Sequence, residues 1–322
     1  MSKIVITGGS GFIGRYFVEK FIGHDVLIFD IRKPDYSSHA RHYQGDVRNI
    51  QQLDEALEST DLVIHLAAMH HDFGIADQEY FDTNVRGAEN VAAAAAKHKV
   101  REIINFSSVA VYGALGNPGP THEKMDPAPT SAYGHSKLQA EKVFENLALE
   151  SGISVVNIRS TVVFGAFNLA NVLNLIKAID KGLYFHVGKG NNIKSIAYVE
   201  NIVDAALFAM SLTKSGVQTF NYVDEPAMTS REIANLQARL LGKKIRFSLP
   251  LGLAVFLAIP FDIFIALSKK NISISSKRVK KFCTQTWHGA SAIREAGFKP
   301  RIRIEDGMAR MIHWYQGTKK NL

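Results

Sequence analysis

The feature that most constrains this chain is a glycine-rich turn directly after its first apolar segment. Lys3–Thr7 has the β-branched composition of a buried strand, and the turn Gly-Gly-Ser-Gly-Phe-Ile-Gly at Gly8–Gly14 leads into a helical pattern. In such a unit one glycine allows the tight turn, one lets the backbone approach a pyrophosphate, and one lets the helix pack closely on the strand. The N–H groups and dipole of the helix N-terminus favour a diphosphate. The turn therefore predicts a dinucleotide site that includes Gly8, Gly11, Phe12, Ile13 and Gly14.

The first half of the chain alternates between strand-like and helix-like segments. Strands are expected at Lys3–Thr7, Val26–Asp30, Leu62–Leu66, Glu102–Ser107 and Ser154–Arg159, and helices at Phe12–Phe21, Ile50–Glu58, Asn84–His98 and Ser131–Ser151. Apolar strands that alternate with helices predict an α/β fold of the Rossmann type, a doubly wound parallel sheet covered on both faces. We expect a dinucleotide-binding domain over residues 1–165, with the sheet completed by about residue 220, and a smaller, mainly substrate-binding lobe over residues 166–322.

The end of the second strand indicates which dinucleotide is bound. Asp30 lies there, and a carboxylate at this place hydrogen-bonds both ribose hydroxyls of adenosine and repels a 2′-phosphate, which favours NAD. Arg32 could instead receive a 2′-phosphate, so NADP stays an alternative. Asp46, before Val47, is placed either to reach the adenine amino group or to cap a simple turn.

The catalytic residues are expected on the helix at 131–151 and at the end of a strand. Tyr133 and Lys137 are four residues apart, so both side chains share one helix face. A nearby ammonium stabilises a phenolate and lowers the pKa of the tyrosine, which can then exchange a proton with an alcohol or a carbonyl during hydride transfer. Ser108 can hold the substrate oxygen opposite Tyr133. We predict Tyr133, Lys137 and Ser108 as the catalytic set.

Together these motifs resemble the extended short-chain dehydrogenase/reductase family, in its NAD-dependent epimerase/dehydratase group and bacterial sugar-nucleotide branch. The resemblance covers about the first 210 residues, and it includes His65–Ala68, Asn84–Gly87, Ser107–Gly113 and Arg159–Gly165. It implies that Tyr133 is the acid/base, that Lys137 also binds the nicotinamide ribose, and that Ser108 orients the substrate. It implies a homodimer through helices near Val85–Lys97 and Ser131–Leu149. Further cofactor contacts are expected from Val47, Leu66, Ala67, Ala68, Asn84, Ser107, Ser160 and Val163.

Two groups of histidines have plainer interpretations. His65 is not connected to the predicted catalytic set, and a structural role beside the glycine-rich turn is expected for it. His70, His71 and Asp72 are adjacent in the sequence, so their side chains point to different sides, and no second cluster completes a ligand set. We therefore expect no metal site.

The substrate is less well specified than the cofactor. Lys194 follows a Gly-x-Gly segment where the family's sugar-nucleotide enzymes often have arginine, and a lysine can pair with a diphosphate as a point charge. One hypothesis is a nucleotide-sugar epimerase or 4-ketoreductase of polysaccharide synthesis. One alternative is a 3β-hydroxysteroid-type or lipid-alcohol dehydrogenase, because the asparagine at position 201 is also similar to that branch of the family. The other alternative is a non-catalytic NAD sensor. Under the first hypothesis the substrate contacts are Ser108, Val109, Lys194, Arg278 and Lys281.

Dehydration chemistry is not expected. By resemblance, the family's dehydratases carry an Asp-Glu pair directly after the catalytic serine or threonine, whereas Val109 and Ala110 stand there in this chain. Neither side chain can move a proton. The nearest carboxylates in sequence, Glu123 and Asp126, lie in the following loop.

The C-terminal region is basic and follows an apolar stretch. Residues 268–322 hold 13 Lys and Arg against 3 Asp and Glu, in a chain of net charge +8. Such a field suits a phosphate-bearing ligand or an anionic membrane, and we expect no nucleic-acid partner. Leu249–Leu267 has one charge, Asp262; Pro260 and this charge favour buried or partly buried helices, with peripheral membrane contact as the second possibility. The single cysteine and the absence of a signal-like N-terminus suggest a cytoplasmic protein.

Overall fold

A computed structural model of the chain describes residues 1–70, 74–113, 119–213, 215–268 and 275–319. His71 and Asp72 lie outside these residues. The chain divides into two compact units, which are described separately. The first unit comprises Met1–Val163, Val199–Val223 and His288–Arg301, and the second comprises Phe164–Tyr198, Asp224–Trp287 and Ile302–Leu322.

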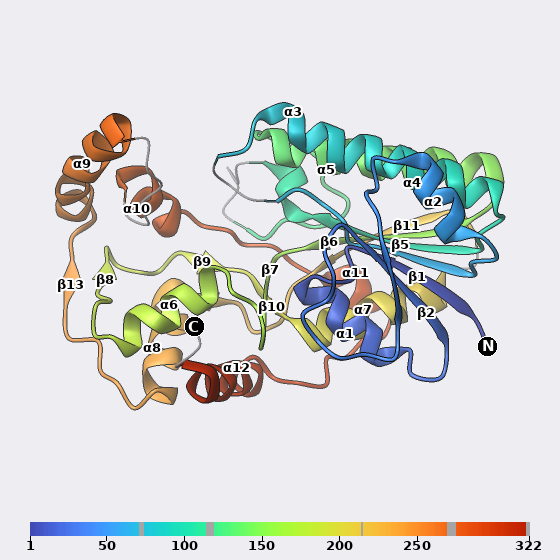
Figure 1. Ribbon diagram of the computed structural model, residues 1–322. Coiled ribbons are helices and arrows are strands. Elements are labelled where there is room, and N and C mark those ends of the chain that lie inside the picture. The colour runs from blue at the N-terminus through green and yellow to red at the C-terminus, as the bar shows by residue number, and fades with distance from the viewer. Residues whose placement is uncertain (71–73, 114–118, 214, 269–274, 320–322) are drawn as a thin grey trace. The chain divides into compact units, whose positions relative to one another are not determined.

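A seven-stranded sheet in the order β11-β6-β5-β4-β1-β2-β3 forms the centre of the first unit (Figure 1). All neighbouring strands pair in parallel. The order reverses between β1 and β4, which is the crevice where doubly wound folds bind dinucleotides. The expected Rossmann-type fold is confirmed. The strands are β1 Lys3–Thr7, β2 Asp25–Asp30, β3 Arg41–Gln44, β4 Leu62–His65, β5 Glu102–Ser108, β6 Ser154–Ser160 and β11 Val217–Tyr222.

Helices cover both faces of this sheet (Figure 1). One face carries α2 (Ile50–Leu57), α4 (Arg86–Lys97) and α5 (Ala132–Ser151), and the other carries α1 (Phe12–Lys20) and α7 (Val199–Leu212). The alanines of α4 allow it to pack closely, since Ala88 and Ala95 are fully buried. The remaining helices are α3 (Asp77–Tyr80), the π-helix η1 (Phe81–Val85), the 3₁₀-helix η2 (Val109–Tyr112) and α11 (Ser291–Glu295).

The boundaries of α5 follow from local chemistry. The Ser131 side chain accepts a hydrogen bond from the Gly134 N–H at 3.1 Å and caps the helix as the sequence predicts. Gly152 then ends the helix at φ +71°, a left-handed conformation that glycine adopts without strain. The helix expected at Asn84–His98 instead begins at Arg86, because η1 occupies the preceding turn.

In the second unit α8 (Ser230–Leu240) packs against α6 (Asn171–Asp180), with which it forms a small apolar core, and also against α12 (Ile304–Thr318). Gly307 of α12 lies against the Tyr198 ring, where a Cβ would come within 2.6 Å of a ring carbon. The short strands are β7 Val162–Phe164, β8 His186–Val187, β9 Ile193–Lys194, β10 Ile196–Tyr198, β12 Met228–Thr229 and β13 Ser248–Leu249; β12 pairs with β9 and β13 with β8.

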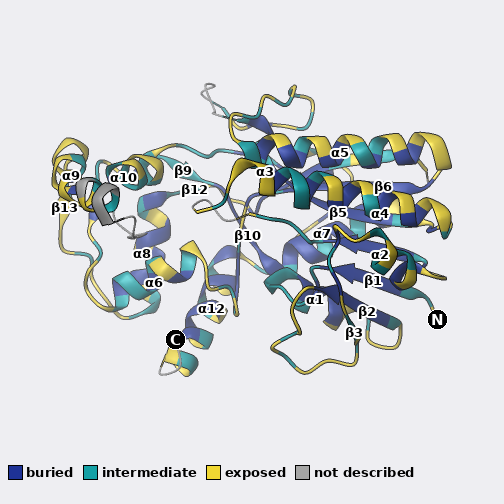
Figure 2. Cartoon of the chain, turned by 45° about the horizontal axis from the view of Figure 1, so that its top comes forward, coloured by how far each residue is buried: buried dark blue, intermediate teal, exposed yellow. Residues whose placement is uncertain are grey.

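The apolar stretch at 249–267 forms most of α9 (Leu251–Ser268), which is followed by α10 (Ser276–Cys283). The expectation that this stretch is buried or partly buried is wrong for most of its large side chains, although Val255 and Ile265 are half-buried. Phe256 is 67% and Phe264 49% exposed, and among the residues of α9 whose burial the structure describes only the small Ala254 and Ala258 are buried. Much of α9 is accordingly coloured as exposed in Figure 2. Within the part of the chain that the structure describes, no helix has the length and hydropathy needed to cross a membrane.

Candidate active site

The glycine-rich turn connects β1 to α1 with little room for side chains. Gly8 has φ +71°, and a Cβ on it would lie 2.6 Å from the Ala67 nitrogen. A Cβ on Gly14 would lie 2.3 Å from the Gly9 carbonyl oxygen, so this glycine lets α1 begin against the turn. On Gly11, in contrast, a Cβ would meet only the Gly8 carbonyl oxygen, at 3.1 Å. Gly11 therefore leaves its backbone open to a ligand at the start of α1, where Phe12 and Ile13 form the first turn.

Asp30 lies at the carboxyl end of β2 and is 7% exposed. Its two carboxylate oxygens accept hydrogen bonds from the Ser10 N–H at 3.1 Å and the Arg32 N–H at 3.0 Å. These bonds hold the carboxylate beside the glycine-rich turn, as expected for a group that binds a ribose. The Arg32 residue is exposed, and its backbone rather than its guanidinium contacts Asp30.

The loop after β3 has an ion pair that the sequence analysis did not include. Arg48 Nε donates to both Asp46 carboxylate oxygens, at 3.0 and 2.9 Å. This side-chain hydrogen bonding holds the pKa of Asp46 below its usual value. The Asp46 carboxylate is thus engaged within its own loop, while the neighbouring Val47 is buried against Gly87 of α4.

The segment after β4 lies against the glycine-rich turn and is held by Asn84. The Leu66 N–H donates a hydrogen bond to the Thr7 carbonyl at 2.9 Å, and the Ala67 backbone packs against Gly8. Ala68, next in the chain, is half-buried. The Asn84 amide accepts from the Met69 N–H at 2.7 Å and donates to the Ser136 hydroxyl at 2.9 Å. Asn84 therefore connects this segment to α5, which is a positioning role.

His65 and its surroundings agree with the structural role expected for it. The ring is buried, and its Nδ1 lies 2.8 Å from the Thr7 hydroxyl. Burial lowers the pKa of His65 to about 3, and the positive charge of Lys137 contributes in the same direction. The imidazole is therefore neutral at physiological pH.

The inward face of α5 carries Tyr133, Lys137 and Glu141 at four-residue spacing. Tyr133 is half-buried, and its ring lies edge-on to Tyr80 at 6.0 Å. Lys137 is 3% exposed, and none of the described residues accepts a hydrogen bond from its ammonium. Burial lowers the pKa of Lys137 to about 8, against the opposing effect of the Glu141 carboxylate. A buried ammonium without an acceptor is costly, so this side chain is arranged for a ligand.

The carboxyl ends of β5 and β6 bring three serines to the same edge of the sheet. The Ser108 hydroxyl accepts from the Ala110 N–H at 3.2 Å and caps η2, which begins at Val109. The Ser160 hydroxyl donates to the Ser107 carbonyl at 3.1 Å. The Ser107 hydroxyl is buried and has no hydrogen-bond partner among the described residues. Val163, half-buried, follows β6 in β7.

The first turn of α5 lies against η2. A Cβ on Gly134 would come within 2.6 Å of the Ala110 carbonyl oxygen, so only a glycine lets the turn that carries Tyr133 approach the residues that follow Ser108. The structure thereby brings the three predicted catalytic residues to the same edge of the sheet as the glycine-rich turn, at the carboxyl ends of the strands.

Sequence analysis missed a buried network next to this site. Arg159 of β6 makes a two-pronged ion pair with Glu141, with Nε–Oε1 at 3.0 Å and Nη2–Oε2 at 2.7 Å, and both side chains are buried. Arg159 also donates to the Tyr112 hydroxyl at 2.8 Å, which in turn donates to Asn221 at 2.8 Å. The available signal was the second four-residue step on α5, which leads from Lys137 to Glu141 on the same helix face as Tyr133.

The basic residues predicted to hold a substrate diphosphate lie in the second unit. Lys194 of β9 donates to the Thr284 carbonyl at 2.6 Å and to the Lys281 carbonyl at 3.3 Å. Burial lowers its pKa to about 8. Lys194 thus holds the end of α10, the helix that carries Arg278 and Lys281.

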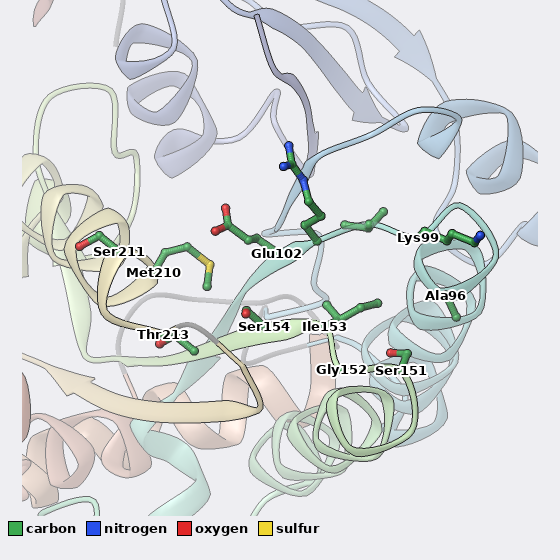
Figure 3. A pocket seen from close by; sticks show the side chains of 12 residues that line it. Ala96, Lys99, Glu102, Ser151, Gly152, Ile153, Ser154, Met210, Ser211 and Thr213 are labelled. Atoms are coloured by element: carbon green, nitrogen blue, oxygen red, sulfur yellow. The ribbon is translucent and has the colours of Figure 1, made fainter.

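A hollow of about 770 Å³ lies at the other edge of the sheet, at the amino ends of β5 and β6 (Figure 3). Its lining includes Glu102, Ser154 and Met210. Doubly wound folds bind their ligands at the carboxyl ends of the strands, so we do not assign this hollow to the active site.

A parallel sheet with a glycine-rich turn at its switch point defines a dinucleotide-binding protein. The chain belongs to the NAD dependent epimerase/dehydratase family, whose model matches residues 4–222. It is an NAD-dependent epimerase or oxidoreductase of the extended short-chain dehydrogenase/reductase group, and the resemblance and the cofactor expected from the sequence are confirmed.

Individual relatives place the chain within this family. It is 37% identical, over 97% of its length and 95% of the relative's, to N-acetyl-alpha-D-glucosaminyl-diphospho-ditrans,octacis-undecaprenol 4-epimerase of Escherichia coli O157:H7. It is 25% identical, over 98% of its length and 97% of the relative's, to a decarboxylating sterol-4-alpha-carboxylate 3-dehydrogenase of Candida albicans. The UDP-glucose 4-epimerase of Thermus thermophilus, solved with NAD, has the same fold, with a TM-score of 0.77 and 18% identity over 98% of this chain and 99% of that one.

The residues of the first unit fit NAD. The open backbone at Gly11 suits the pyrophosphate, and the Asp30 carboxylate suits the adenosine ribose. Among the described residues, the Ser107 hydroxyl has no hydrogen-bond partner and the ammonium of the buried Lys137 has no acceptor. The hydroxyl can donate and accept and the ammonium can donate, so the hydroxyls of a nicotinamide ribose could bind to both.

Proposed function

We propose that this protein interconverts an N-acetylhexosamine and its C4 epimer while the sugar is linked through a diphosphate to a polyprenyl carrier. The observation that carries the chemistry is the buried, unpartnered ammonium of Lys137 one turn from Tyr133, on a helix packed beside Ser108. The carrier is suggested by the printed name of the E. coli relative, which is similar to this chain over nearly its whole length. A nucleotide-linked sugar is the alternative.

In the proposed mechanism the chain moves one proton and holds one oxygen. Bound NAD supplies a nicotinamide ring that takes up a hydride and returns it. The Tyr133 phenolate removes the proton from the sugar's C4 hydroxyl as that hydride leaves C4, and the carbon becomes a ketone. Ser108 donates a hydrogen bond to the ketone oxygen, and Lys137 keeps the phenolate available by its positive charge. After the ketone presents its other face, Tyr133 returns the proton to the oxygen.

Glu141 and Arg159 are positioning residues in this proposal. Their side chains bond to each other and Arg159 also bonds to Tyr112, so neither is proposed to contact a reacting atom. The Glu141 charge raises the pKa of Lys137 and so opposes the effect of burial. The ion pair with Arg159 fixes the Glu141 carboxylate on the same helix face, one turn beyond Lys137.

The test is to incubate the purified protein with N-acetylglucosaminyl-diphospho-undecaprenol and, separately, with UDP-N-acetylglucosamine. We expect the C4 epimer from the lipid-linked sugar, identified after mild acid hydrolysis by chromatography against standards. If the epimer formed from the nucleotide sugar and not from the lipid-linked sugar, the substrate would be a nucleotide sugar, the alternative named above. No epimer from either would refute the function.

The same incubations distinguish the remaining chemistries. A dehydrogenase, which the similarity to a sterol dehydrogenase keeps as a second candidate, would accumulate NADH and a ketone. Dehydration would remove one water from the sugar. In the proposed reaction the hydride returns to the sugar, so we expect no NADH to accumulate. We expect no dehydration, because Val109 and Ala110 carry no acid and Glu123 already accepts a hydrogen bond from the Asn221 N–H at 2.9 Å.

The proposed assembly is the homodimer that the family resemblance implies, formed through α4 and α5. These helices lie side by side on one face of the sheet. We further propose that the second unit is the substrate-binding lobe and that its Lys194, Arg278 and Lys281 contribute positive charge to diphosphate binding.

A further inference from the structure

Helix α9 reverses the usual distribution of side chains on a surface helix. Its inward face is formed by small or polar residues at four-residue spacing, Ala254, Ala258 and Asp262, of which the two alanines are buried. Its large side chains are exposed: Leu253 is 47%, Phe256 67%, Leu257 52% and Phe264 49% exposed. A contiguous exposed apolar face of this kind marks a contact surface.

The one acidic side chain of α9 is turned away from that face. Asp262 accepts a hydrogen bond from the Ser276 N–H at 3.0 Å, at the first residue of α10. A carboxylate is favoured there, because the N-terminus of a helix has unsatisfied N–H groups and a positive dipole. Asp262 is the only Asp or Glu between Leu251 and Cys283, so its position leaves the surrounding surface without exposed negative charge from this segment.

Helix α10 adds positive charge beside the apolar face. It packs against α9, as both views of the chain show (Figures 1 and 2). Lys277, Lys280 and Lys281 are exposed, and at spacings of three and four residues they share one helix face. Lys194 holds the C-terminal end of the same helix through carbonyl oxygens, which keeps α10 in place.

From this arrangement we propose that α9 and α10 form a docking surface for the anionic surface of a phospholipid bilayer. The large side chains of α9 enter the boundary between headgroups and acyl chains, as in other interfacial helices. The lysines of α10 contact anionic headgroups, which attract basic segments close to the membrane. Charge complementarity selects this occupant: a second copy of the chain would place the same lysines against each other.

Docking through this surface requires no substrate, so it stands independently of the proposed function. Its consequence for that function is that the protein works at the surface where a polyprenyl-linked sugar resides. Vesicle binding measured without substrate and epimerisation of the lipid-linked sugar measured in detergent without vesicles can therefore fail separately.

The experiment is sedimentation of the full-length, NAD-loaded protein with vesicles of phosphatidylethanolamine and phosphatidylglycerol, and with vesicles of phosphatidylcholine alone. We expect binding to the anionic vesicles that weakens as salt is raised. The double variant Phe256→Ser/Phe264→Ser should bind at least ~10-fold more weakly, because two aromatic side chains no longer enter the bilayer. Lys277→Glu/Lys280→Glu should lose a similar factor on anionic vesicles only.

Matched controls change exposed residues of the same unit outside the surface. Leu183→Ser, at a position 70% exposed, and Lys181→Glu, at an exposed lysine, should leave vesicle binding unchanged. Retention of NAD shows that the first unit of each variant has folded, and a far-UV circular dichroism spectrum and unfolding midpoint like those of the wild type show the same for the second unit. The proposal would be overturned if the wild-type protein did not bind anionic vesicles, or if the double variants bound them as tightly as the wild type. A further result would also overturn it: the wild type self-associates in analytical ultracentrifugation, the Phe256→Ser/Phe264→Ser variant does not, and neither binds vesicles. A second copy of the chain would then cover α9.

Discussion

Replacing Lys137 by methionine should abolish activity and yet stabilise the protein when NAD is absent. Lys137 is 3% exposed, and burial lowers its pKa from 10.5 to about 8. At 1.36 kcal/mol per pKa unit, keeping this group charged at pH 7 costs the folded state about 3 kcal/mol. Methionine fills a similar volume without a charge, so the NAD-free variant should unfold at a higher temperature than the wild type at pH 7.

The pH dependence of this difference has a definite sign. Between pH 8 and 10.5 the unfolded chain binds a proton at this position that the folded chain has lost, so wild-type stability rises with pH in this range. The advantage of Lys137→Met should therefore shrink as the pH is raised from 7 toward 10.5. Saturating NAD should also reduce it, because the ammonium then gains acceptors.

The assay is thermal unfolding of NAD-stripped protein, followed by circular dichroism at several pH values, with and without NAD. Lys142→Met, at an exposed lysine of the same helix, is the control and should change neither the midpoint nor its pH dependence. An NAD-free Lys137→Met variant that is less stable than the wild type at pH 7 would show that the ammonium has a partner in the folded chain, and the reasoning would be refuted.

Three further changes test the site. Tyr133→Phe should reduce turnover at least ~100-fold, the usual contribution of a general acid/base, while NAD binding in a titration stays near wild type; retained activity would exclude Tyr133 as the acid/base. Asp30→Ala should weaken NAD and relieve repulsion of NADP, so the ratio of the two measured affinities should move toward NADP; an unchanged ratio would contradict the role of Asp30. Glu141→Gln should destabilise the fold by about 3–5 kcal/mol in denaturant unfolding, because it leaves Arg159 buried and unpaired. Asp25→Asn, in a solvent-exposed pair, should cost about 1 kcal/mol or less, and equal effects would contradict the argument.

Much of the fold could be predicted because its signals are local. The strand Lys3–Thr7 and the cap at Ser131 occur where the sequence places them, since each depends on residues within a few positions. The parallel arrangement of the strands also followed from the alternation of strands and helices, because crossover connections leave few topologies. The helix boundaries were less accurate. The π-helix before Arg86 includes Asn84, whose side chain bonds to Met69 and Ser136, 15 and 52 residues away in the sequence.

The candidate site divides in the same way. By itself the sequence determined the glycine-rich turn, the Tyr133–Lys137 spacing and the position of Asp30 at a strand end, because steric demands and helical periodicity act over short distances. Only the tertiary structure decided that Lys137 is buried without an acceptor, that Glu141 pairs with Arg159, and that α9 presents its phenylalanines outward. Burial and long-range pairing depend on which surfaces meet after the chain has folded, and a run of apolar residues has the same sequence whether another part of the chain covers it or not.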